Sequence, residues 1–114
     1  MSSRVTPRQV VARMVNGASV SFVDARSETQ WKRSERKIVG AVRARLPSLV
    51  RDAARVSPSG LLVVYGHDAD DAHALHVAEQ LRSLGFPEVR ILTGGFEAWE
   101  ELDFAVQPAR EAAN

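Results

Sequence analysis

The chain has 114 residues, of which 45% are hydrophobic and 25% charged, a balance typical of one soluble globular domain. Its apolar runs are too short to cross a bilayer, and no signal-peptide core follows the first residues, so we expect a cytoplasmic protein. The ratio of 13 arginines to two lysines favours a bacterial source with a GC-rich genome.

The net charge of +1 conceals an uneven distribution of charged residues. Residues 1–57 contain twelve Lys and Arg against four Asp and Glu, whereas residues 58–114 contain three against ten. These charges either pair across the folded surface, or form a basic face that binds an acidic partner or drives self-association. Few aromatic residues lie among the basic ones, so nucleic acid is not an expected partner.

The chain contains no cysteine. A disulfide, a thiolate metal site, a cysteine nucleophile and a persulfide are therefore all excluded for this chain alone. No sequence pattern indicates a cofactor.

Helices and strands are expected to alternate from the start of the chain. Thr6 and Pro7 predict the cap and first residue of a helix that ends near Gly17. Residues 20–23 are apolar and β-branched, which predicts a strand. Ser27 then predicts the cap of a second, short helix.

The next segment, residues 32–37, is very polar and is expected on the surface. Residues 38–42 predict a short strand or extended stretch, and Pro47 opens a helix. Residues 57–60 read Ser-Pro-Ser-Gly and predict a turn. Three side chains of the helix are expected to share one buried side: Leu49, Val50 and Ala53.

Residues 61–65 are the most apolar strand, expected to be central and buried on both faces. A loop over 66–71 leads to a helix over 71–84. A strand over 89–92 and a turn at 93–95 precede a last short helix. The core positions expected on these two helices are Ala74, Leu75, Ala78, Leu81, Phe96, Trp99 and Leu102.

Strands that alternate with helices over short connections predict an α/β fold with a parallel sheet covered on both faces. Such sheets bind ligands at the carboxyl ends of their strands. The candidate site therefore lies in the loops after Val23, Tyr65 and Leu92. Pro108 is expected to begin a frayed tail.

Four segments resemble the rhodanese-like domain family, in the family's order. They are residues 22–26 (Phe-Val-Asp-Ala-Arg), 38–41 (Ile-Val-Gly-Ala), 62–65 (Leu-Val-Val-Tyr) and 84–99, with Leu-Gly-Phe and Gly-Gly-Phe-x-Ala-Trp. The resemblance implies a rhodanese-like three-layer α/β/α domain over residues 5–108, with a roughly five-stranded parallel sheet. Residues 109–114 would form a C-terminal tail.

In active members of this family, the residue after the tyrosine is a cysteine whose thiolate accepts sulfur as a persulfide. Gly66 stands at that position here, and Asp71 stands where an arginine often assists anionic donors. The resemblance thus implies an inactive domain and no sulfurtransferase activity in the isolated chain. The vestigial loop consists of Gly66, His67, Asp68, Ala69, Asp70 and Asp71.

The loop's three carboxylates would raise the pKa of a thiol at position 66 and repel anionic donors. We expect them to cap the following helix, although they could also bind a cationic group or a partner. A metal site with His67 and His73 is possible in spacing but matches no standard pattern. His73 and His76 are expected on a solvated face, and nothing selects a Ser-His-Asp triad.

Asp24 and Arg26 follow a strand end, where they either hold neighbouring loops together or line the pocket. Gly94 and Gly95 predict a tight turn rather than a phosphate loop, since no Lys-Ser/Thr follows. Phe96 and Trp99 are expected to anchor the last helix in the core.

We expect an inactive rhodanese-like module that binds an unidentified protein or small ligand, with contacts at the vestigial loop and at residues 32–37. A sulfurtransferase-related function with a partner's cysteine, or a structural, self-associating role, remains an alternative. The candidate ligand- or partner-binding residues are Asp24, Arg26, Gly66, His67, Asp68, Asp70 and Asp71.

Overall fold

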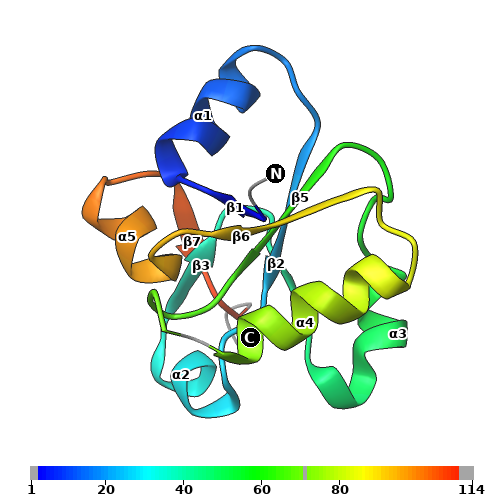
Figure 1. The fold of residues 1–114 in the computed structure, drawn as a ribbon. Coiled ribbons are helices and arrows are strands. Elements are labelled where there is room, and N and C mark those ends of the chain that lie inside the picture. Colours follow the sequence, from blue (N-terminus) through cyan, green and yellow to red (C-terminus); the bar gives the residue numbers. More distant parts are fainter. Residues whose placement is uncertain (1–2, 71, 111–114) are drawn as a thin grey trace.

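The computed structural model describes residues 3–70 and 72–110 and contains a five-stranded, entirely parallel sheet (Figure 1). An antiparallel pair, β3 (Arg36–Ile38) with β7 (Val106–Pro108), lies beside it. The predicted α/β fold with a parallel sheet of five strands is confirmed. The strands of the main sheet, in spatial order, are β1 (Arg4–Val5), β6 (Glu88–Leu92), β5 (Leu61–Tyr65), β2 (Val20–Asp24) and β4 (Val42–Arg43).

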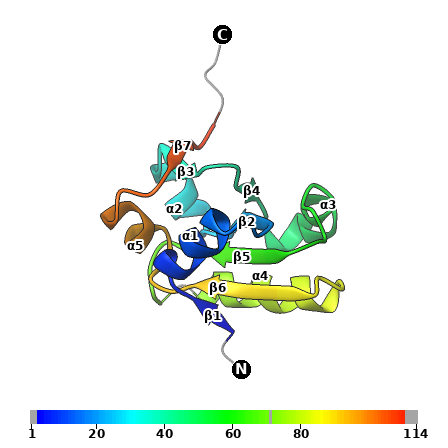
Figure 2. The ribbon, with the colours of Figure 1, turned by 90° about the horizontal axis from the view of Figure 1, so that it is seen from above.

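Helices cover both faces of the sheet, which gives three layers (Figures 1 and 2). One face packs against α1 (Pro7–Val15) and α5 (Gly95–Glu101), and the other against α3 (Leu49–Ala53) and α4 (Ala72–Ser83). The short helix α2 (Glu28–Arg33) follows β2 at the carboxyl end of the sheet. A 3₁₀ helix, η1 (Leu46–Ser48), precedes α3.

The central strand β5 is fully buried, as its composition predicts. It pairs in parallel register with β2 on one side and β6 on the other. Leu62 and Val64 face α3 and α4, whereas Leu61, Val63 and Tyr65 face α1 and α5. The loop that follows Tyr65, the last residue of β5, therefore begins at the carboxyl end of the sheet, between the two helical layers.

The two predicted helix caps are confirmed. The Thr6 hydroxyl accepts a hydrogen bond from the N–H of Gln9 at 3.1 Å, and the Gln9 side chain accepts one from the N–H of Thr6 at 2.9 Å. The Ser27 hydroxyl accepts from the N–H of Gln30 at 3.2 Å. Both caps satisfy donors that a helix start leaves unpaired.

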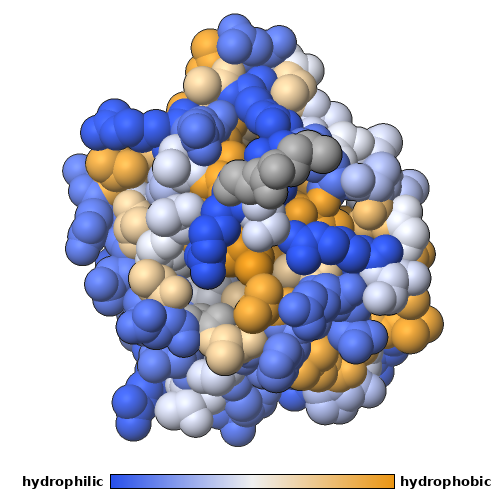
Figure 3. All heavy atoms as spheres, viewed as in Figure 1, coloured by the Kyte–Doolittle hydropathy of each residue, from blue (hydrophilic) through white to orange (hydrophobic). Residues whose placement is uncertain are grey.

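Two predicted core residues are exposed instead. Val50 of α3 is 74% exposed and Leu75 of α4 is 40% exposed. The buried side of α4 includes Val77, which the sequence analysis did not select. Neighbouring residues of a helix point about 100° apart, so Leu75 turns away from the core although Ala74 before it is buried. Exposed apolar patches also appear on the face that carries α4, which is otherwise largely hydrophilic (Figure 3).

The C-terminal segment does not begin to fray at Pro108, which closes β7. The N–H of Ala109 donates to the carbonyl of Glu35 at 2.8 Å, and Arg110 also contacts α2. The polar residues 32–37 lie on the surface only in part, since Arg36 and Lys37 belong to β3, which pairs with β7.

In residues 3–70 and 72–110, no helix combines the length and apolar character needed to span a bilayer.

Candidate functional site

The loop after β5 is anchored to the start of α5. The Gly66 carbonyl accepts a hydrogen bond from the N–H of Phe96 at 2.8 Å, and the His67 carbonyl accepts one from the N–H of Glu97 at 3.0 Å. Gly66 is buried, while the loop tip is exposed. The backbone of the loop is thus held in place at Gly66 and His67, and Gly66 contributes no side chain.

Gly95 makes this anchoring possible. Its φ is +63°, and a Cβ built at residue 95 would lie 2.7 Å from the Gly66 carbonyl oxygen and 2.8 Å from the amide nitrogen of Asp68. Glycine is therefore required at residue 95 by both backbone conformation and close approach. The predicted tight turn at 94–95 is confirmed, and it seats the loop as well as starting α5.

The loop's carboxylates lie at its exposed tip. Asp68 accepts a hydrogen bond from the N–H of Asp70 at 3.0 Å, a turn inside the loop that precedes α4. Asp71, the third predicted carboxylate, lies outside the described residues. His67 Nε2 lies 3.8 Å from a carboxylate oxygen of Glu97. No group of three His, Asp or Glu side chains converges as metal ligands within the described ranges.

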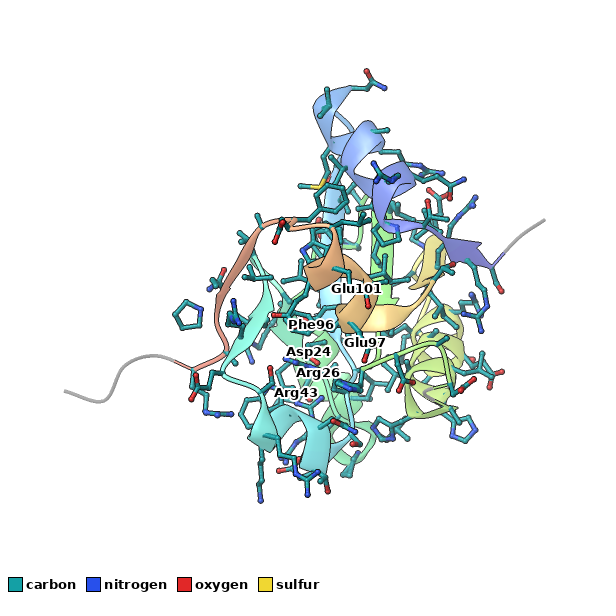
Figure 4. The ribbon with its side chains drawn as sticks, turned by 90° about the vertical axis from the view of Figure 1, so that its left-hand side faces the viewer. Asp24, Arg26, Arg43, Phe96, Glu97 and Glu101 are labelled. Carbon is teal, nitrogen blue, oxygen red and sulfur yellow. The ribbon has the colours of Figure 1, made fainter. Side chains whose placement is uncertain are left out.

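Asp24 and Arg26 form a buried ion pair at the carboxyl end of β2 (Figure 4). Arg26 Nε and NH2 both donate to the carboxylate, the latter at 2.7 Å, and the Arg26 N–H adds a third donor at 3.1 Å. NH2 also donates to the carbonyl of Arg36 at 2.9 Å. Because NH2 also contacts Arg36, the pair ties the end of β2 to β3. Both side chains have zero exposure, so the pair has no direct contact with solvent.

Aromatic rings enclose this ion pair. The Arg26 guanidinium carbon lies 4.5 Å from the centre of the Phe96 ring, which stacks on Tyr65 with 5.9 Å between centroids. The Tyr65 hydroxyl accepts from the N–H of Ile38 at 3.2 Å. Burial, with the nearby negative charge of Asp24, raises the pKa of Tyr65 well above its ordinary value of 10.0. Tyr65 is therefore a neutral structural group.

The sequence analysis missed a cationic cavity next to this pair. Arg43, the last residue of β4, donates to the Asp24 carbonyl at 3.1 Å. Together with Glu28, Arg45, Pro47 and His73, it lines a cavity of about 260 Å³. A usable signal existed, because Arg43 and Arg45 stand at alternate positions just after the extended stretch expected at 38–42, and ligand sites lie where parallel strands end.

Three cations of the predicted basic surface, residues 32–37, make contacts within the protein, although the side chains of Lys32 and Arg36 stay 69% and 63% exposed. Lys37 Nζ donates to the carbonyl of Ala41 at 2.9 Å, and Arg36 Nε lies 3.6 Å from a carboxylate oxygen of Glu100. Lys32 forms an i,i+4 pair with Glu28 at 3.8 Å. Of these contacts, the pair of Arg36 and Glu100 joins the basic first half of the chain to the acidic second half.

Comparison with solved structures yields the same fold. A protein from Bacillus halodurans matches with a TM-score of 0.76 and 21% identity, over 93% of this chain and 77% of that chain. The solution structure of a rhodanese-like domain from Anabaena sp. matches with a TM-score of 0.72 and 24% identity, over 100% and 87%. No curated protein matches this chain significantly.

A third structure, from Rhodopseudomonas palustris and described as a possible tyrosine phosphatase, has a TM-score of 0.68 and 23% identity, over 93% of this chain and 85% of that chain. Among family models, that of the Rhodanese-like domain matches residues 6–102, which is most of the sequence. The match includes β5, the loop after it and α5. This chain therefore belongs to the rhodanese-like domain family.

Proposed function

We propose that this domain is a catalytically inactive rhodanese-like module that binds a ligand or partner through the loop after β5. The observation that carries the proposal is the anchored loop. Its backbone is fixed by α5 and by Gly95, yet Gly66 offers no side chain for chemistry. A loop that is anchored at Gly66 and His67 and exposed at residues 68–70 offers a surface for recognition but no nucleophile.

Sulfur transfer needs a thiolate, and this chain has no cysteine anywhere. The surroundings of position 66 also oppose one. Asp68 and Asp70 belong to the same loop, and Glu97 lies beside His67, so negative charge surrounds the place where an anionic donor would approach. We therefore expect no sulfurtransferase activity from the isolated domain.

The contact surface we propose is the exposed loop tip at Asp68, Ala69 and Asp70, with the half-buried His67 beside it, while the buried Gly66 contributes only backbone. The buried pair of Asp24 and Arg26 would support this surface from below without contacting the ligand, since both side chains are fully enclosed.

The catalytic part is tested with the wild-type protein, thiosulfate and cyanide, with thiocyanate as the measured product. We expect no thiocyanate above the protein-free rate. Gly66→Cys is the informative variant, because it restores the nucleophile and leaves the loop acidic. It should remain far slower than the same variant combined with Asp68→Asn and Asp70→Asn, since these changes remove charge that raises the thiol pKa. Turnover by the wild type would contradict the proposal.

The binding part is tested by photo-cross-linking in cells that naturally contain the protein. A cross-linking residue in place of Ala69 reports on the loop tip, and one in place of Ala12 on α1 is the matched control, since both positions are exposed. We expect an adduct of defined mass at residue 69 that disappears when Asp68 and Asp70 become asparagine. Identical adducts from both positions would contradict recognition by the loop.

A second candidate function is sulfur transfer that uses a partner's cysteine. The anchoring of the loop favours it, because a catalytic cup also needs fixed backbone N–H groups. Sulfur transfer should then appear only when the cross-linked partner is added, and mutation of the partner's cysteine should abolish it.

A further inference from the structure

The cavity lined by Glu28, Arg43, Arg45, Pro47 and His73 contains an internal arrangement of two guanidiniums around one anion. Arg45 NH1 lies 3.2 Å and Arg43 NH2 lies 3.7 Å from the same oxygen, Oε2 of Glu28. Both arginines therefore already converge on a single oxyanion. The carboxylate at that point is part of the protein, but it is 47% exposed and lies in the first turn of α2.

The cluster that includes this cavity has more positive than negative charge among the described residues. Its ion pairs connect four cations with two carboxylates, and a third carboxylate, that of Asp52, accepts a hydrogen bond from the Arg45 N–H at 3.0 Å. One of the two ion-paired carboxylates, that of Asp24, is hydrogen-bonded to the buried Arg26. Arg43 lies farther from this carboxylate, at 4.0 Å. The cations are Arg26, Arg43, Arg45 and Lys32, and the two carboxylates of these ion pairs are Asp24 and Glu28.

Arg43 is the least hydrated of the cavity's cations. Its side chain is 16% exposed, and its Nε is buried with no hydrogen-bond partner in the described part of the chain. Burial lowers the pKa of the Arg43 guanidinium, although an arginine in a protein stays charged. One face of the group stacks on Trp31, 5.2 Å from the ring centre. A buried cation without a full counter-ion is stabilised by an added anion.

We propose that Arg43 and Arg45 bind a dianionic oxyanion, namely phosphate or the phosphate group of a small phosphomonoester, and that Glu28 is the internal carboxylate this ligand displaces. Guanidiniums match the oxygen spacing of phosphate and donate to it in pairs. A dianion offsets more of the cluster's positive charge than a monocarboxylate, which would merely replace Glu28 by its equivalent. His73, in the first turn of α4, lines the same cavity.

The experiment is a titration of the intact chain with inorganic phosphate at about pH 8, followed by the amide NMR signals of residues 28, 43 and 45. Saturable shifts are expected in the wild type. Glu28→Gln removes the competing charge and should tighten binding by about fivefold, the usual upper limit for one exposed ion pair. Arg45→Gln should weaken binding by at least a similar factor.

Arg8→Gln is the matched control, because it removes the same charge from an exposed position on α1, outside the cavity. It should leave the affinity unchanged. Equal losses in Arg8→Gln and Arg45→Gln would mean unspecific attraction to net charge. Failure of both the wild type and Glu28→Gln to saturate would overturn the proposal.

Two further titrations identify the source of the dianion. Tighter binding of phenyl phosphate than of inorganic phosphate assigns the cavity to a phosphomonoester, and the reverse assigns it to the free ion. Acetate should bind at least tenfold more weakly than either, and comparable binding of acetate would contradict selection of a dianion. None of the lining residues belongs to the loop after β5, so the outcome is independent of the proposed loop function.

Discussion

Arg26 encloses the Asp24 carboxylate with donors from its own side chain and from its own backbone N–H, and the two residues have no exposed side-chain surface. This geometry is possible because Arg26 lies two residues after Asp24, the last residue of β2. The same carboxylate also faces Arg43, at 4.0 Å. Asp24 is thus the direct counter-ion of Arg26 and only a more distant neighbour of Arg43.

Replacement of Asp24 by asparagine should destabilise the fold strongly. The variant keeps the shape but leaves Arg26 buried without a negative partner, and loss of one member of a buried pair costs about 3–5 kcal/mol. Urea unfolding at neutral pH measures the loss. Glu100→Gln is the control, because it breaks a half-exposed pair with Arg36 and should cost less than about 1 kcal/mol. Similar losses from both variants would contradict the assigned role of Asp24.

Gly95→Ala should separate the loop from α5. A left-handed conformation costs a non-glycine residue about 1–2 kcal/mol, and contact of the new Cβ with the Gly66 carbonyl adds about 1–3 kcal/mol. Gly17→Ala is a matched control, since Gly17 also has a positive φ of +85° but no atom within 4 Å of an added Cβ. The difference between the losses in unfolding free energy of the two variants measures the contact of the new Cβ with the loop. The amide NMR signals of His67 and Asp68 should shift only in Gly95→Ala.

Local chemistry explains which features the sequence could predict. The caps at Thr6 and Ser27 depend on side chains within three residues, and the burial of β5 follows from its uninterrupted apolar composition. The position of Gly66 after Tyr65 likewise follows from strand order. Each of these predictions needs no knowledge of distant contacts.

The features that were missed depend on contacts between distant segments. Pairing of β3 with β7 joins residues about seventy positions apart, and no local pattern specifies it. The convergence of Arg43 and Arg45 on Glu28 requires α2 to fold over the end of β4. Val50 and Leu75 were misassigned because an apolar residue next to a buried stripe looks the same in sequence as one within it.

Arg110→Ala should loosen α2 without unfolding the domain. The Arg110 guanidinium donates to the carbonyls of Trp31, Lys32 and Ser34 at the end of the helix, and lies 4.7 Å from the Trp31 ring centre. These exposed contacts are worth about 0.5–1.5 kcal/mol. Hydrogen exchange should speed up by about tenfold at the N–H of Ser34 and remain unchanged in β5. Uniform acceleration across the domain would mean a global effect instead.

Asp52 should make stability fall at acidic pH. Although burial raises the pKa of this carboxyl, hydrogen bonds from the Arg45 N–H at 3.0 Å and the Ser48 hydroxyl at 2.8 Å outweigh burial and hold the pKa below its ordinary value of 3.8. A group whose pKa is lower in the folded state stabilises the protein above its unfolded pKa, and that contribution is lost as pH falls through the folded value.

Asp52→Asn should therefore lose about 1–2 kcal/mol at pH 7, because hydrogen bonds to a charged acceptor become bonds to a neutral one. Its free energy of unfolding should then fall less than that of the wild type when the pH is lowered from about 5 to about 2. Urea unfolding across this pH range measures both effects, with Glu79→Gln on the exposed side of α4 as the control. Parallel pH profiles for wild type and Asp52→Asn would show that the carboxylate is not stabilised by Arg45 and Ser48, since the charge would then contribute equally in both states.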